Sequence, residues 1–135
     1  MAKPLQVVVV TPEATVLEQE AEFVALPLYD GEIGIAPLHS PLIGRLGYGE
    51  MRIKTAAKTL HYYIDGGFVQ VVDDVVSVLT NRAVPASKLD IAVAQAQLNS
   101  AMIKPAHTPE LLAIRDRAIA QARAQIHIAK VASRA

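Results

Sequence analysis

All seven glycines of this 135-residue chain lie in its first half, at or before Gly67. The segment from residue 1 to Pro85 holds 13 valines and 8 alanines, whereas the segment from Ala86 onward holds 2 valines and 14 alanines. Valine together with glycine is typical of strands joined by turns, and alanine without glycine is typical of helices. The chain is therefore expected to fold as a strand-rich part followed by a helical part, with the boundary near Pro85.

Short apolar stretches recur at regular intervals through the first part of the chain. Turn signals such as Gly47-Tyr48-Gly49, Asp65-Gly66-Gly67 and Asp73-Asp74 separate them, and no helical period intervenes. This pattern favours an antiparallel sandwich or a flattened barrel. Val75–Leu79 is apolar on both faces except at Ser77, which predicts a central strand, and Asp73-Asp74 predicts a tight hairpin before it. The nine stretches that we interpret as strands are Gln6–Thr11, Thr15–Gln19, Glu22–Leu28, Glu32–Ala36, Leu42–Leu46, Glu50–Thr55, Leu60–Asp65, Phe68–Val72 and Val75–Thr80.

The second part of the chain predicts two antiparallel helices. Ser87 is expected to cap the first, with Asp90 in the place of a capping-box partner, and Pro105 ends it. Thr108 is a second N-cap, for a helix from Pro109 to about residue 132. Because alanine buries little area, this pair is expected to detach easily from the strand-rich part. A pair that stays packed on the strand-rich part is the alternative. The apolar stripes are Ile91, Ala94, Leu98, Ala101 and Met102 in the first helix and Leu111, Ile114, Ala118, Ala122, Ile126 and Ala129 in the second.

Charge divides at the same boundary as composition. Residues 1–86 carry 6 basic and 10 acidic side chains, and residues 87–135 carry 7 and 3, so a chain of zero net charge has an acidic part and a basic part. Zero net charge disfavours a general nucleic-acid-binding role. The longest relevant apolar run, Val7–Val10, is far short of the roughly 20 residues of a membrane span, and the first residues do not resemble a secretory signal. We expect a soluble, cytoplasmic protein with domains over 1–86 and 87–135.

The sequence predicts no catalytic, cofactor-binding or metal-binding residues. It has no cysteine, and its four histidines do not form the two-histidine spacing of a helical metal site. No serine lies in a Gly-x-Ser-x-Gly elbow, and Gly66-Gly67 precedes a predicted strand, which indicates a hairpin rather than a phosphate-binding loop. A free-standing enzyme stays open as an alternative, which perturbed titratable groups in a deep pocket would support.

The segment Gly31–Leu42 has the sequence Gly-Glu-Ile-Gly-Ile-Ala-Pro-Leu-His-Ser-Pro-Leu. It resembles the Gly-Glu-x-Gly-Ile-x-Pro-x-His-x-Pro-Leu signature of the ε subunit of bacterial F-type ATP synthase, called δ in mitochondria. Thr11-Pro12, Gly66–Val71 and Val76–Leu79 match further family patterns in the same order. The resemblance implies a mainly β fold, with an N-terminal ten-stranded antiparallel β-sandwich followed by an antiparallel two-helix hairpin.

The resemblance also implies a role in the central stalk of the synthase rather than catalysis. In this family the sandwich binds the γ subunit and rests on the ring of membrane c subunits. The subunit is thus peripheral, at the cytoplasmic face of the cell membrane, and meets the membrane only through the c ring. The family's glutamate that faces the c ring is Glu32 here, and the loop with His39 helps to shape the same interface. The interface with γ is expected to be large and mostly apolar.

Family members use the C-terminal helices for regulation, and two alternatives follow for this chain. The helices can extend along γ and inhibit ATP hydrolysis, with basic residues meeting the catalytic α and β subunits; here the basic residues are Arg115, Arg117, Arg123, Lys130 and Arg134. Alternatively, the hairpin is a nucleotide-sensing module, because some members bind ATP through an Ile/Leu-Asp-x-x-Arg-Ala pattern. This chain has Leu89–Ala94 at that place, with Val93 instead of the arginine, which predicts little or no ATP binding.

Overall fold

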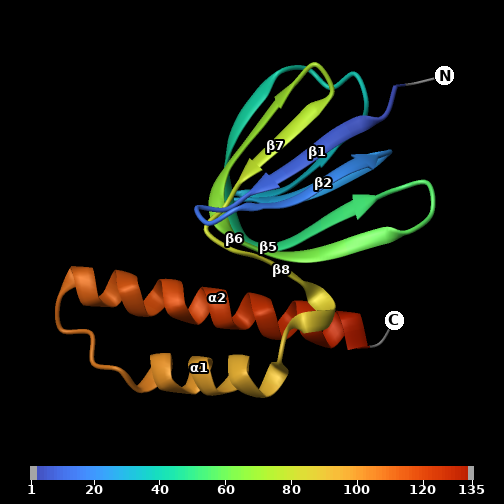
Figure 1. The fold of residues 1–135 in the computed structure, drawn as a ribbon. Coiled ribbons are helices and arrows are strands. Elements are labelled where there is room, and N and C mark those ends of the chain that lie inside the picture. The colour runs from blue at the N-terminus through green and yellow to red at the C-terminus, as the bar shows by residue number, and fades with distance from the viewer. Residues whose placement is uncertain (1–2, 134–135) are drawn as a thin grey trace. The chain divides into compact units, whose positions relative to one another are not determined.

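The computed structural model describes residues 3–133, and the chain divides between Pro85 and Ala86 into two compact units. The first unit is built of strands and the second of helices (Figure 1). The strands are β1 (Leu5–Val10), β2 (Thr15–Ala21), β3 (Phe23–Leu28), β4 (Gly31–Ile35), β5 (Leu42–Lys54), β6 (Thr59–Val72), β7 (Val75–Leu79) and β8 (Ala83–Pro85). A 3₁₀ turn (Ala86–Lys88) precedes the helices α1 (Ile91–Ile103) and α2 (Pro109–Ser133).

The eight strands form one continuous sheet in the order β2-β1-β7-β6-β5-β3-β4, with β8 paired to β6 outside this order. Neighbouring strands are antiparallel except β1 and β7, which pair in parallel from Gln6 opposite Val75 to Val10 opposite Leu79. The sheet is therefore mixed, and the prediction of a purely antiparallel sandwich is wrong at this pair. The prediction that Val75–Leu79 is a central strand is confirmed, because β7 lies between β1 and β6.

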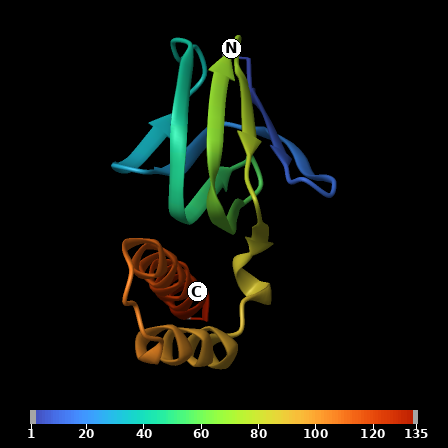
Figure 2. The same cartoon turned by 90° about the vertical axis from the view of Figure 1, so that its left-hand side faces the viewer.

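The count of strands differs from the prediction because two strands are unusually long. β5 joins the predicted strands Leu42–Leu46 and Glu50–Thr55, and β6 joins Leu60–Asp65 and Phe68–Val72. β8 was not predicted, so the described residues hold eight strands rather than nine from the pattern or ten from the resemblance. Figures 1 and 2 show β5 and β6 bending near their middle, which folds one sheet into two layers.

Glycines produce the bend in β6. Gly66 and Gly67 have φ of +69° and +106°, in the left-handed region that favours glycine. Before them the inward-facing residues are even-numbered, as at Ile64, and after them odd-numbered, as at Val69 and Val71. Pairing with β5 keeps one register across the bend, so the strand is continuous. The prediction of a hairpin at Asp65-Gly66-Gly67 is therefore wrong: these residues bend a strand and do not end it.

The core of the β unit lies between the two layers. Its side chains come from β1, β3, β5, β6 and β7 above all, and most of them are β-branched, which suits a pleated sheet. The buried apolar side chains of this cluster are Leu5, Val7, Val9, Ala21, Val24, Leu26, Ile35, Leu46, Met51, Ile53, Ile64, Val69, Val71, Val76 and Val78.

The predicted hairpin at Asp73-Asp74 is confirmed, and it also anchors a loop. Both aspartates have positive φ, 51° and 64°, as the two central residues of a type I′ turn require. The backbone N–H of Leu38 donates to Oδ1 of Asp74 at 2.7 Å. The loop that joins β4 to β5, which contains His39, is thus tied to the β6–β7 turn.

The helical unit is an antiparallel hairpin, seen in Figures 1 and 2. Thr108 caps α2 as predicted, since its Oγ1 accepts from the N–H of Leu111 at 3.1 Å. The predicted cap Ser87 is wrong: it lies in the 3₁₀ turn, and Asp90 caps α1 by accepting from the N–H groups of Ala92 and Val93. A carboxylate at the N-cap suits the positive end of the helix. Of the predicted stripes, Ala94, Ala101, Ala122, Ile126 and Ala129 are buried, whereas Ile91, Met102, Leu111 and Ile114 are exposed.

Candidate partner-binding surfaces

One outward face of the β unit exposes several large apolar side chains, where a solvated sheet would be mostly polar. It is formed by β5, β6 and β7, and we call it the apolar sheet face. Phe68 lies opposite Leu79, and Val72 lies opposite Val75, so these side chains stand beside each other on one face. Phe68 is 57% exposed and Ile43 is 75% exposed. Its exposed apolar side chains are Ile43, Phe68, Val72, Val75 and Leu79, and the polar pair Gln70 and Ser77 lies among them on the same face.

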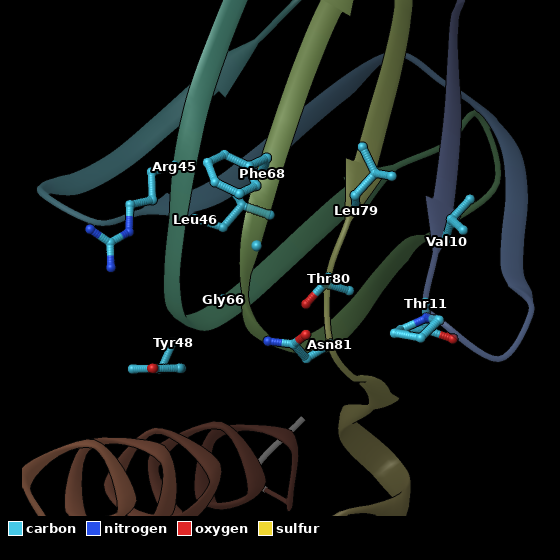
Figure 3. A pocket seen from close by; sticks show the side chains of 12 residues that line it. Val10, Thr11, Arg45, Leu46, Tyr48, Gly66, Phe68, Leu79, Thr80 and Asn81 are labelled. Carbon is cyan, nitrogen blue, oxygen red and sulfur yellow. The ribbon is translucent and has the colours of Figure 1, made fainter. Parts of the chain in front are cut away.

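A shallow hollow of about 700 Å³ lies at one end of the apolar sheet face (Figure 3). Phe68 and Leu79 form part of its wall, and Val10 from β1 extends the wall because it pairs with Leu79. Arg45 lies at the rim, with its guanidinium 4.6 Å from the centre of the Tyr29 ring. Exposed large apolar side chains gathered on one face, with polar residues around them, are typical of a protein–protein contact site.

A row of charged side chains lies on the outward face of the other layer. Glu32 of β4 and Arg52 of β5 form a two-point ion pair, with 2.5 Å from Oε1 to Nη2 and 3.2 Å from Oε2 to Nη1. Arg52 Nη1 also donates to Oε1 of Glu50 at 3.2 Å, and Oε2 of Glu50 lies 3.3 Å from Nδ1 of His61. Hydrogen bonding to Glu32 raises the pKa of the Arg52 guanidinium above its ordinary value, against a smaller opposing effect of burial.

The two residues predicted to meet the c ring have separate partners. Glu32 is engaged by Arg52, whereas Nδ1 of His39 lies 2.7 Å from the backbone oxygen of Ser40. His39 belongs to the loop that Asp74 holds. Within residues 3–133, no hydrogen bond or ion pair joins Glu32 to His39.

The basic residues of α2 do not share one side of the helix. At 3.6 residues per turn, Arg123 and Lys130 lie within about 20° of each other, and Arg115 lies about 80° from Arg123. Arg117 lies about 120° from Arg123, on another side of the helix. Arg115 Nε lies 4.0 Å from Oδ1 of Asp116. Arg134 lies outside the described residues.

The start of α1, which carries the segment compared above with a nucleotide-binding pattern, takes part in helix capping. A hollow of about 640 Å³ lies here, lined by residues 86–92 with Ala129 and Ala132. Its charged lining residues are Lys88 and Asp90, and Oδ1 of Asp90 accepts two backbone hydrogen bonds. Val93 cannot supply the charge or the donors that a phosphate requires.

The described residues give no indication of metal chemistry or of a membrane-crossing helix. Within residues 3–133, no three histidine, aspartate or glutamate side chains gather so that they could hold a metal ion. Neither α1 nor α2 has an apolar stretch long enough to cross a membrane.

The apolar sheet face was missed in the sequence, although a signal for it is present. Val75–Leu79 is apolar on both faces, and Phe68–Val72 has Phe68 and Val72 at outward positions. In Val75–Leu79 this pattern predicts a central strand, and it is equally compatible with an exposed apolar side. The structure places β7 centrally and leaves its second apolar side exposed, at Val75 and Leu79.

Comparison with known proteins gives the family of the chain. Residues 4–86 match the family model described as "ATP synthase, Delta/Epsilon chain, beta-sandwich domain". The ATP synthase epsilon chain of Rhodopirellula baltica is 48% identical over 126 residues, which cover 93% of this chain and 98% of the relative. The epsilon chain of Nitratidesulfovibrio vulgaris is 34% identical over 131 residues, which cover 97% and 96% of the two chains.

Two solved structures share the fold at low sequence identity. A chain of the Euglena gracilis mitochondrial ATP synthase, in a structure of OSCP, F1 and the c-ring, has a TM-score of 0.80 and 20% identity, covering 98% of this chain and 82% of that one. A chain in the central stalk and c-ring structure of the Tetrahymena thermophila mitochondrial ATP synthase has a TM-score of 0.75 and 12% identity, covering 95% and 98%. From its sequence relatives and its β-sandwich, the chain belongs to the family of ATP synthase epsilon subunits.

Proposed function

We propose that this chain is a non-catalytic subunit of the central stalk of an F-type ATP synthase, which links the γ subunit to the c ring. The observation that carries the proposal is the apolar sheet face, an exposed apolar surface on a rigid sheet. A joint that transmits torque requires a large, rigid and well-packed interface, and such a surface suits it. The low-identity structural relatives come from an OSCP, F1 and c-ring structure and from a central stalk and c-ring structure, which supports this assignment.

The β unit offers two different surfaces for two partners. The apolar sheet face suits γ, because its exposed apolar side chains gain most from burial against another protein. The charged row around Glu32 suits the polar loops of the c ring, where electrostatic contacts give orientation more than affinity. The loop with His39 is proposed to shape the same stalk interface. This arrangement makes the subunit peripheral to the membrane, on its cytoplasmic face.

The hairpin is proposed to regulate ATP hydrolysis by extending along γ toward the catalytic α and β subunits. Its support is the basic character of α2, where Arg115, Arg117, Arg123 and Lys130 outnumber the acidic Glu110 and Asp116. Arg123 and Lys130, on one side of the helix, are the best placed to meet an acidic surface together.

Co-purification with γ tests the stalk role, and ATPase assays test the regulatory role. We expect the 1–86 fragment to keep γ binding, because the β unit has its own core. Complexes without residues 87–135 are expected to hydrolyse ATP faster than complexes with the full chain. Reversing the charge of both Arg123 and Lys130 to glutamate should release inhibition, whereas Arg117→Glu should change it less.

The two outcomes are independent. Loss of γ binding by a folded 1–86 fragment would refute the stalk role of the β unit. Equal ATPase rates with and without the hairpin would remove the regulatory role and leave the stalk role in place.

The nucleotide-sensing alternative is expected to fail in a direct titration. Because the hollow at the start of α1 lacks an arginine among its described lining residues, and because Val93 replaces the family's arginine, ATP should show no binding at micromolar concentrations by calorimetry. The variant Val93→Arg serves as the comparison, since it restores the family pattern. Micromolar ATP binding by the unaltered chain would contradict the prediction and favour the alternative.

A further inference from the structure

We propose that Arg52 is the positioning residue of Glu32, holding its carboxylate in one orientation for the partner surface. The inference rests on the proposed contact of Glu32 with the c ring. It adds a residue to that contact, because Arg52 acts through Glu32 and need not touch the partner itself. The observation behind it is the two-point ion pair between the two side chains.

The pair crosses a whole strand of the sheet. Arg52 lies opposite Ala25 of β3, and Glu32 lies opposite Pro27 of β3, so β3 runs between the two charged residues. Ala25 and Pro27 are short side chains on the same face, which leaves the guanidinium room to reach over β3. A lysine could supply the charge but not the planar fork that engages both carboxylate oxygens.

A second carboxylate holds Arg52 in turn. Glu50 lies two residues before Arg52 on the same side of β5, and its side chain is 18% exposed, against 52% for Glu32. It accepts from Nη1 of Arg52, and its other oxygen lies beside His61, which is paired with Arg52 across β5 and β6. The less exposed Glu50 thus holds the Arg52 guanidinium on one side, and the more exposed Glu32 lies on the other side, in contact with solvent.

Glu32 is the more exposed of the two carboxylates that contact Arg52, which suits a role in partner binding rather than in folding. Glu32 lies on the edge strand β4, and without Arg52 its side chain would sample several rotamers. Holding it before binding removes an ordering cost that each unrestrained side chain would add on association. A partly exposed ion pair contributes little to folding stability, so its loss should change partner affinity more than stability.

The first test uses the isolated full chain and NMR signals of its arginine side chains. A guanidinium held by a two-point ion pair rotates slowly about its Cζ–N bonds and gives separate Nη signals. We expect such signals for Arg52, and their collapse in the variant Glu32→Gln. Glu18→Gln, which removes a carboxylate from β2, is the matched control and should leave them unchanged. Averaged Arg52 signals in the unaltered chain would overturn the inference.

The second test measures affinity for a γ–c-ring complex freed of this subunit. Arg52→Lys and Arg52→Gln are each expected to weaken binding about threefold to tenfold, with the unfolding midpoint nearly unchanged. Lys54→Gln, which removes a positive charge from the same outward face of β5, should have little effect. In a Glu32→Gln background, Arg52→Gln should weaken binding no further, since Arg52 acts through Glu32.

The outcomes distinguish the inference from the proposed function. If Glu32→Gln weakens binding and the Arg52 variants do not, the positioning role is overturned and the c-ring contact of Glu32 stands. If the effects of Glu32→Gln and Arg52→Gln add, Arg52 acts on its own and the inference is likewise overturned. If Glu32→Gln leaves binding unchanged, the proposed contact fails, and the inference fails with it.

Discussion

Replacing Phe68 with glutamate is expected to weaken binding of the full chain to γ about a hundredfold. Phe68 lies on the apolar sheet face between Leu79 of β7 and Arg45 of β5, its neighbours across the two strand pairs. Large aromatic side chains near the centre of an interface carry much of its binding energy, and a carboxylate buried there without a partner adds a desolvation cost. Because Phe68 is already mostly exposed, the substitution should leave folding intact. Titration of labelled γ with the variant measures the effect.

Two matched variants separate the apolar contact from other causes. Phe68→Leu keeps an apolar side chain and is expected to lose only a few fold in affinity. Thr59→Glu adds a carboxylate at the other end of β6, away from the apolar sheet face, and should bind γ as the unaltered chain does. Binding by Phe68→Glu within a few fold of the unaltered chain would place the γ contact elsewhere on the molecule.

Local signals in the sequence predicted the local features of this fold well. Thr108 before Pro109, and Asp73-Asp74 between two apolar stretches, predict a helix start and a turn, and the structure confirms both. These features depend on neighbouring residues, whose propensities are visible in a short window. The position of β7 inside the sheet was also predicted, because its apolar residues occupy both faces.

Features that join distant segments were not predictable in the same way. At Gly66-Gly67 a strand that bends and a strand that ends leave the same local pattern, glycines that interrupt an alternation. The parallel pair of β1 with β7 joins segments about 70 residues apart, and β8 is too short to carry a period. Asp90 rather than Ser87 caps α1, although both are good N-cap residues, because the 3₁₀ turn occupies Ser87.

In the candidate surfaces too, the residue types can be found in the sequence, whereas the contacts between distant segments cannot. Glu32 and His39 were identified through a resemblance, since nothing in their spacing indicates a partner. The link from Arg52 to Glu32 exists because β3 and β4 fold back beside β5, so two residues 20 positions apart meet across an intervening strand. The apolar sheet face likewise depends on strand order and register. Sequence alone gives the residue types, and the topology decides which of them share a face.

Replacing Gly67 with alanine is expected to destabilise the β unit by about 3–5 kcal/mol. Gly67 has a φ of +106°, which a residue with a side chain rarely adopts. A Cβ built there would lie 1.9 Å from the backbone oxygen of Leu79 and 2.8 Å from Cα of Thr80. Both contacts are with backbone at the end of β7, so a rotamer change cannot relieve them and β7 must move. Denaturant unfolding of the full chain, followed by a probe of the β unit, measures the loss.

Gly31→Ala is the control that separates backbone strain from this collision. Gly31 also has a positive φ, +141°, but nothing lies within 4 Å of the position that its Cβ would take. Its replacement should cost only the strain, about 1–3 kcal/mol, with no displacement of a strand. Since Leu79 lies beside Gly67 and belongs to the apolar sheet face, Gly67→Ala should also weaken γ binding, whereas Gly31→Ala should not. Equal stability losses in the two variants would mean that β7 yields freely at Leu79, which would contradict the rigid face that the γ contact requires.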